Sequence, residues 1–390
     1  AAGGLVGELA LGKYRSYYGG GAAVDYAHTF MSAALSGGAT GYPASGHYDV
    51  DFSGAADGTR AAAAVTGAAV LTTWMYVVHE LGSAVALCEA AQLPAAVAAF
   101  DASVAYYVGS LEGTKGRSGE GRLIYSVADE LCGEFKTCAT RGIEGEAQAN
   151  TLVIDKITNA REAAHSGACA VAAAAAERAV QLMVVPLVQG TLHAAYHSDA
   201  SLHPPGAPPT AEAAEMAGVG AAFATAVLPL VHACSPAAAA TIEANMRLGA
   251  TADIEAVKAA FEGTYTCLGI TCSDVGGFYN DDIRAYYWGL EPCTDPHAAM
   301  AGYVPRTNVI DDGALDRDVA AMAAQLAEVP PDFERAAAIY AEGGNSKAYA
   351  EWVVSPLDTA YDAGTVVGPR WACDGCATGT VFVDAEVGDE

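Results

Sequence analysis

The stretch VLTTWMYVVHELGSAVALCEAA, residues 70–91, predicts a long and largely buried helix, because apolar side chains and alanine dominate it. Two alanine-rich runs, AAAAV at 61–65 and AVAAAAAERAV at 170–180, also favour helix, since alanine loses no side-chain entropy there. The chain has 390 residues and is 52% hydrophobic, which is enough for full cores. We therefore predict a mainly all-α protein that folds without a partner.

The charge of the chain argues against two classes of partner. With 46 acidic and 19 basic residues, the formal net charge is −27. Such a chain repels phosphate backbones and anionic lipid surfaces, so we expect neither nucleic acid nor a membrane surface as a partner. Cations fit better, although an acidic surface that only keeps the protein soluble explains the same charge.

One apolar segment is long enough to cross a bilayer. Residues 217–241 contain no Asp, Glu, Lys or Arg. The segment is rich in alanine, however, and includes His232, Pro229 and Pro236. We therefore predict a buried core helix and no membrane insertion.

The cysteine content predicts disulfide bonds in an oxidising compartment. The ten cysteines are an even number, and six of them form close pairs. These pairs are Cys132/Cys138, Cys267/Cys272 and Cys373/Cys376. A four-thiolate zinc site is the weaker alternative, because the cysteines are spread over the whole chain. The start, AAGGLVGELA, has no initiating Met and indicates a processed N-terminus, which is compatible with secretion.

Similar phrases in the two halves predict an internal duplication. ATAVLPLVHAC at 224–234 resembles TTWMYVVHELG at 72–82, and KAAFEGTYTC at 258–267 resembles VGSLEGTK at 108–115. The proline-rich segment SDASLHPPGAPPT is typical of a linker. The predicted layout is an irregular N-terminal cap (1–60), a first helical unit (61–200), a linker (201–212), a second helical unit (213–330), and a C-terminal helix with a disulfide tail (331–390). The expected fold is thus two related helical-bundle units stabilised by disulfides.

The region from Asp101 to Asp129 offers ligands for a hard cation. We expect Asp101 and Glu112 to lie on the same face of one helix, with Tyr107, Tyr125 and Asp129 close in sequence. Carboxylates and tyrosine phenolates are hard oxygen donors that suit ferric iron. Alternatively, the tyrosines fill a helix interface and the carboxylates are solvated.

Two histidines in the later part of the first unit form a second candidate. His193 and His197 are four residues apart, which places both imidazoles on one helix face. The glutamate of an H-E-x-x-H motif is missing, so metalloprotease chemistry has no general base. An exposed coincidence at the helix end explains this pair as well as a ligand role does.

Two further histidines recur in the duplicated phrases. His79 and His232 lie on apolar segments, where a hydrogen-bonded core histidine is the simpler interpretation. Their recurrence at similar distances before Glu112 and Glu262 favours a metal role. GRSGEG at 116–121 does not follow a strand and is no dinucleotide motif, and neither a P-loop nor a G-x-S-x-G elbow occurs. We therefore expect no enzymatic activity.

Three phrases resemble a known family. AYYVGSLEG at 105–113, LIYSVADELCGEFKTC at 123–138 and VPLVQGTLHAAY at 185–196 are similar to the iron-assimilating, low-iron-inducible periplasmic proteins of algae. The resemblance implies a secreted, disulfide-containing, mainly helical protein of the periplasmic space or cell wall that binds iron and assists its uptake. KAAFEG at 258–263 lacks the paired tyrosines, which argues against a second equivalent iron site.

The expected function is therefore iron binding without turnover, with ferric iron preferred to ferrous iron. A membrane iron transporter or a ferroxidase is the candidate partner that receives the metal. The predicted ligands are Glu112, Asp101, Tyr107 and His79, then Tyr125 and Asp129, with Glu262 and His232 as pseudo-symmetric partners. Two alternatives stay open: an imelysin-like metallopeptidase, which also uses duplicated helical bundles, and an acidic structural wall protein that binds calcium weakly.

Overall fold

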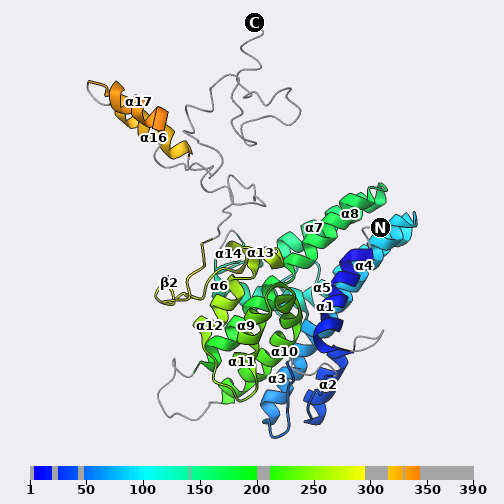
Figure 1. The fold of residues 1–390 in the computed structure, drawn as a ribbon. Helices are drawn as coiled ribbons and strands as arrows, with labels where there is room; N and C mark the ends of the chain where they lie inside the picture. The colour runs from blue at the N-terminus through cyan, green and yellow to red at the C-terminus, as the bar shows by residue number, and fades with distance from the viewer. Residues whose placement is uncertain are drawn as a thin grey trace. The chain divides into compact units, whose positions relative to one another are not determined.

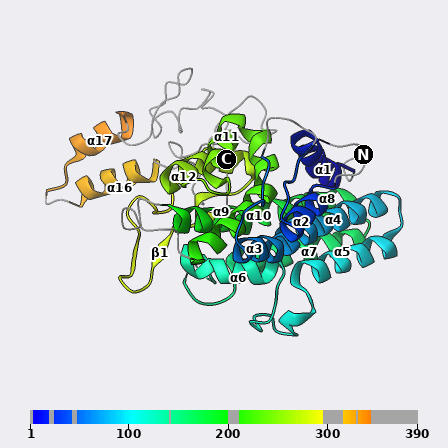
Figure 2. The same ribbon diagram turned by 90° about the horizontal axis from the view of Figure 1, so that it is seen from below.

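The computed structural model divides into two units, Ala1–Cys293 and Thr294–Glu390. It describes residues 4–19, 25–42, 48–139, 142–199, 211–294, 315–327 and 330–342. Helices dominate the described residues (Figures 1 and 2), which confirms the mainly all-α prediction. The second unit contains α16 (Leu315–Leu326) and α17 (Phe333–Glu342).

The first unit is a helical bundle with one short hairpin. Its helices are α1 (Gly4–Tyr18), α2 (Tyr26–Ser36), α3 (Asp57–Gly67), α4 (Trp74–Glu89), α5 (Leu93–Val108), α6 (Ile124–Phe135), α7 (Gln148–His165), α8 (Cys169–Leu182), α9 (Val185–Ser198), α10 (Ala211–Cys234), α11 (Pro236–Met246), α12 (Ile254–Glu262), α13 (Tyr265–Leu268) and α14 (Cys272–Val275). A π-helix, Ala68–Thr73, joins α3 to α4. Strands β1 (Tyr279–Asn280) and β2 (Ala285–Tyr286) pair antiparallel.

Helix α10 lies in the core of this unit. It packs against α3 and α9 (Figures 1 and 2), and a Cβ at Gly218 would lie 2.1 Å from the Thr59 carbonyl oxygen. Glycine therefore permits the close approach of α10 to α3. The first unit spans the predicted linker at 201–212 and ends at Cys293, and the predicted five-part layout stays a prediction. The internal duplication stays a prediction.

Three described helical stretches are long and apolar enough to cross a membrane by length and composition alone: 57–89, 169–198 and 211–234. The most apolar window of α10 is 72% buried within the unit, as expected for a core helix. Pro229 lies inside α10, and its neighbours Leu228 and Leu230 are buried.

The sequence suggested an irregular N-terminal cap, but the described part of residues 1–60 contains regular helices. Helices α1 and α2 both lie in this region, and the tyrosines of α1 belong to the core. Tyr14 and Tyr18 are fully buried, and the Tyr18 hydroxyl donates to the Thr225 carbonyl of α10 at 2.7 Å. The ring of Tyr14 also contacts Trp74. Aromatic burial therefore fixes α1 against the bundle.

Four disulfides confirm the oxidised state of the cysteines, and the described part of the chain contains no free thiol. They are Cys88–Cys169, Cys132–Cys138, Cys234–Cys267 and Cys272–Cys293. The pairing of Cys267 with Cys272 was wrong, because each bonds a cysteine distant in sequence. The predicted pair Cys373/Cys376 lies outside the described residues.

Candidate metal centre

The candidate site begins where α5 ends. Gly109, with φ of +80°, stops this helix, and a 3₁₀ turn at 110–112 carries Glu112 inward. The expectation that Asp101 and Glu112 share one helix face was therefore wrong. The Glu112 side chain is buried, and its Oε2 accepts a hydrogen bond from the Ser118 backbone N–H at 3.1 Å.

Two glycines allow the loop after Glu112 to close over the site. A Cβ at Gly121 would lie 1.7 Å from Glu112 Oε1. Gly116 has φ of +69°, and a Cβ there would lie 2.5 Å from the Tyr125 hydroxyl. The glycine-rich stretch GRSGEG therefore packs closely against the Glu112 carboxylate and the Tyr125 phenol.

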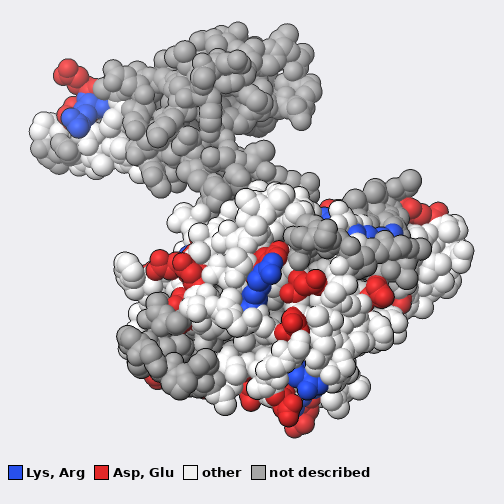
Figure 3. Space-filling view, turned by 60° about the horizontal axis from the view of Figure 1, so that its bottom comes forward, with Lys and Arg blue, Asp and Glu red and all other residues white. Residues whose placement is uncertain are grey.

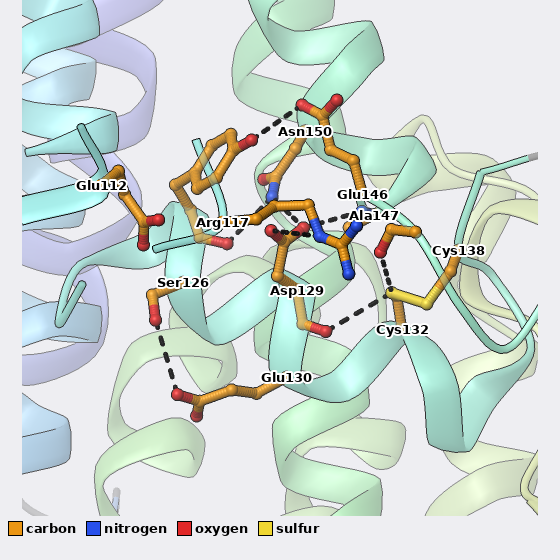
Figure 4. A network of polar contacts seen from close by, with 12 residues as sticks. Glu112, Arg117, Ser126, Asp129, Glu130, Cys132, Cys138, Glu146, Ala147 and Asn150 are labelled. Atoms are coloured by element: carbon orange, nitrogen blue, oxygen red, sulfur yellow. Dashed lines mark hydrogen bonds and ion pairs between the residues drawn. A yellow bond between two sulfur atoms is a disulfide. The ribbon is translucent and has the colours of Figure 1, made fainter. Parts of the chain in front are cut away.

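Asp129 of α6 is the most constrained carboxylate in this region (Figure 4). Its Oδ1 accepts hydrogen bonds from the Ala147 N–H at 2.7 Å and from Asn150 Nδ2 at 2.8 Å. Its Oδ2 is buried and has no hydrogen-bond partner. Arg117 Nε lies 3.9 Å from that oxygen, and the arginine side chain is 52% exposed. One carboxylate oxygen is thus held in place while the other has only a distant counter-charge.

Two tyrosines complete the network. Tyr107 is buried and donates to Asn150 Oδ1 at 2.6 Å, and Tyr125 donates to Glu146 Oε1 at 3.0 Å. Burial is the largest cause that raises the pKa of Tyr107 well above its ordinary value, and the negative charge of Asp129 is the second. Burial and the hydrogen bond to Glu146 raise the pKa of Tyr125 in the same way. Both phenols are therefore protonated at neutral pH.

An open pocket of about 490 Å³ lies beside Asp129. It is lined by Arg117, Asp129, Cys138, Ile143, Glu144 and Gly145. The Cys132–Cys138 disulfide joins the last turns of α6 to Cys138 in the lining of this pocket. Cys132 Sγ lies 3.4 Å from the Asp129 carbonyl oxygen (Figure 4). The carboxylate thus borders a space large enough for a hydrated ion.

The ionisation of Asp129 predicts how stability depends on pH. Burial raises the pKa of its carboxyl above the ordinary 3.8. The folded protein therefore holds this proton more tightly than the unfolded chain, and the stabilisation is lost as pH rises through the folded-state pKa. In metal-free protein with chelator, we expect Asp129→Asn to lose less free energy of unfolding than wild type between about pH 4 and about pH 7. Urea unfolding at both pH values measures this, and equal losses would contradict it.

Four of the predicted ligands meet in this region: Glu112, Tyr107, Tyr125 and Asp129. Tyr125 interacts electrostatically with Glu112 and Asp129, and Tyr107 with Asp129 and Tyr125. Their rings also meet edge to face, with centroids 6.3 Å apart. One turn of α6 brings Tyr125 and Asp129 together, and the packing of α5 against α6 adds Tyr107.

The other four predicted ligands lie outside this network. Asp101 is exposed on α5 and His79 is exposed on α4. His232 lies on α10, and Glu262 lies on α12. Asp101 forms an ion pair with Arg161 at 3.3 Å, and Glu262 with Lys258 at 2.5 Å. His79 is thus not the core histidine that its apolar surroundings suggested.

Sequence reasoning missed Glu146, Asn150 and Arg117. Glu146 and Asn150 follow the Cys132–Cys138 pair in the stretch GIEGEAQAN. For Glu146, the two glutamates on either side of Gly145 were a sequence signal of candidate carboxylate ligands. Asn150 had no such signal, because it lies in the first turn of a separate helix, α7. It is fully buried and donates to both Asp129 and the Tyr125 carbonyl oxygen.

The acidic surface does not by itself mark a metal site. On the face shown in Figure 3, acidic side chains lie in separate small groups and not in one patch. Among the described residues, no group of three or more His, Cys, Asp or Glu side chains is close enough to hold one metal ion.

Comparison with known proteins identifies the family. The family model for the low iron-inducible periplasmic protein matches residues 23–286, which is most of the chain. No curated protein and no solved structure matches the chain. The chain therefore belongs to the low iron-inducible periplasmic protein family, and it is a periplasmic protein linked to iron assimilation.

Proposed function

We propose that the protein binds ferric iron between the 113–121 loop and α6, through Glu112, Tyr125, Asp129 and Glu146. The observation that carries this proposal is Asp129 Oδ2, a buried carboxylate oxygen without a hydrogen-bond partner beside a cavity. A buried anionic oxygen is costly unless it is paired or coordinates a metal. The iron link of the family supports a cation of this kind.

The donor set suits a hard cation. Carboxylate oxygens are available from Asp129, Glu112 and Glu146, and Tyr125 is hydrogen-bonded to Glu146. Burial favours the neutral phenol, so ferric iron has to displace the Tyr125 proton, which a nearby metal charge promotes. Glu146 already accepts that hydrogen bond, so it can pass the proton on to solvent water and then bind the ion as a carboxylate.

Binding requires a local rearrangement of the loop. No three acidic, histidine or cysteine side chains converge on one ion in the described part of the chain. Arg117 is the cation that now stands nearest Asp129 Oδ2, and it is half exposed on the glycine-rich loop. In the proposed iron-bound state, the guanidinium moves outward and the loop brings Glu112 toward Asp129.

The proposed activity is capture without turnover, followed by transfer of the iron to a membrane transporter or a ferroxidase. Asp101, His79, Glu262 and His232 have no role at this site, since their contacts lie elsewhere. A test of the broad proposal is metal analysis and equilibrium binding of ferric iron, supplied as its citrate, to the full chain. Absence of binding would overturn it.

A spectroscopic prediction tests the role of Tyr125. An iron-bound phenolate produces a visible charge-transfer absorption, so we expect the iron-loaded wild type to be coloured. Tyr125→Phe should remove this band while iron remains bound through the carboxylates. Tyr106→Phe is the matched control, because Tyr106 is 41% exposed on α5 and packs on Tyr76. A band that survives in Tyr125→Phe, or is lost in Tyr106→Phe, would remove Tyr125 from the ligand set.

A further inference from the structure

The C-terminal half of α9 carries a second group of potential ligands. His193 and His197 lie one turn apart, with ring centroids separated by 4.5 Å and ring planes tilted by 52°. His193 Nδ1 lies 2.6 Å from Glu134 Oε2, which α6 provides. The pair is thus part of a helix-to-helix contact and not an exposed coincidence.

The carboxylate defines which nitrogen of His193 can bind a metal. When neutral His193 donates its Nδ1–H to Glu134, the lone pair is on Nε2. A carboxylate behind an imidazole is the usual second-shell arrangement of metal-ligating histidines, where it fixes the tautomer and raises the basicity of the ligand. The His193 side chain is 17% exposed, so an ion can approach it.

Aromatic rings hold the histidines in place. Tyr196 stacks on Phe278 with centroids 4.4 Å apart, and its ring meets His197 edge to face at 5.4 Å. Phe278 also lies 6.3 Å from His193. This packing limits the rotamers of both imidazoles, so little side-chain entropy is lost when they bind an ion together.

We propose that His193 and His197 bind one divalent transition-metal ion through two imidazole nitrogens, with Glu134 positioning His193. Water completes the coordination, in agreement with the absence of a three-residue group in the described chain. Imidazole suits Cu²⁺ and Zn²⁺, whereas carboxylate and phenolate suit a harder ion. The site is therefore separate in ligands and in metal class from the proposed iron site, and Cu²⁺ should bind more tightly than Zn²⁺.

The experiment is a Cu²⁺ and Zn²⁺ titration of the full chain by calorimetry, with electron paramagnetic resonance of the copper form. We expect one equivalent of Cu²⁺ with two imidazole nitrogens in the wild-type spectrum. His193→Ala and His197→Ala should each lose this signal, and Glu134→Gln should weaken binding by roughly 10–100-fold. His165→Ala is the control, because His165 is a single exposed histidine at the end of α7.

The wild-type spectrum can overturn the proposal even if a variant fails to fold. A spectrum without two imidazole nitrogens, or no Cu²⁺ binding, would overturn the proposal, as would equal affinity in the folded His193→Ala and His197→Ala variants. The titration is repeated in Asp129→Asn, where the copper signal should persist. Loss of iron binding there with copper binding intact separates this inference from the proposed iron function.

Discussion

Asp129→Asn is expected to lower the affinity for ferric iron by more than about 100-fold. Loss of an outer-shell partner already costs roughly 10–100-fold, and a directly bound anionic ligand contributes more. The asparagine keeps the Oδ1 acceptor that the Ala147 N–H and Asn150 Nδ2 use, so the local fold is retained. Equilibrium competition against a chelator of known affinity measures the change. Unaltered affinity would exclude Asp129 as a ligand.

Arg117 gives the opposite expectation in the same assay. Arg117→Gln removes the guanidinium charge beside Asp129 Oδ2, which in the proposed site competes with iron for that oxygen. Because partly exposed ion pairs contribute about 0.2–1 kcal/mol, we expect iron affinity to rise by up to about fivefold. Arg122→Gln is the matched control, since this exposed arginine donates to the Gly121 carbonyl oxygen. A decrease in Arg117→Gln alone would mean that the guanidinium helps to bind iron.

Removing the Cys88–Cys169 disulfide by replacing both residues with alanine is expected to lower the free energy of unfolding by about 4 kcal/mol. The bond joins the end of α4 to the start of α8 across a sequence separation of 81 residues. In the chain-entropy account, a longer closed loop restricts the unfolded chain more and so stabilises the fold more. Urea unfolding without reductant measures the loss.

The Cys132–Cys138 disulfide provides an internal comparison. It closes a loop with a sequence separation of only 6, for which the same account gives about 2 kcal/mol. The double alanine variant at these positions should therefore unfold at a higher urea concentration than the Cys88/Cys169 variant. The reverse order would show that local packing at the end of α6 outweighs loop closure.

The composition of the chain was sufficient to predict its helical class. Alanine-rich runs fix local backbone preference, and that preference does not depend on distant residues. The disulfide partner of Cys267 depends instead on where α13 meets α10, which no sequence spacing reveals. The tyrosines of α1 were missed because their role is long-range burial against α10 and not a local pattern.

The candidate site shows the same division. Tyr125 and Asp129 could be predicted because one turn of α6 brings them together. The common face of Asp101 and Glu112 failed because one glycine, Gly109, ends α5 and breaks the periodicity on which that prediction depended. Asn150 joins the site from another helix through buried hydrogen bonds, a tertiary feature that a single sequence does not encode in any short motif.

The disulfide beside Asp129 has a consequence for the timing of the proposed metal capture. Cys138, which is bonded to Cys132, lines the same pocket as the Asp129 carboxylate. A newly made chain in a reducing cytosol lacks this disulfide. We therefore expect the end of α6 to fray in the reduced chain, which leaves the pocket beside Asp129 without a fixed edge. Oxidation in the periplasm completes that edge, so under the proposed function the protein captures iron only after it has left the reducing cytosol.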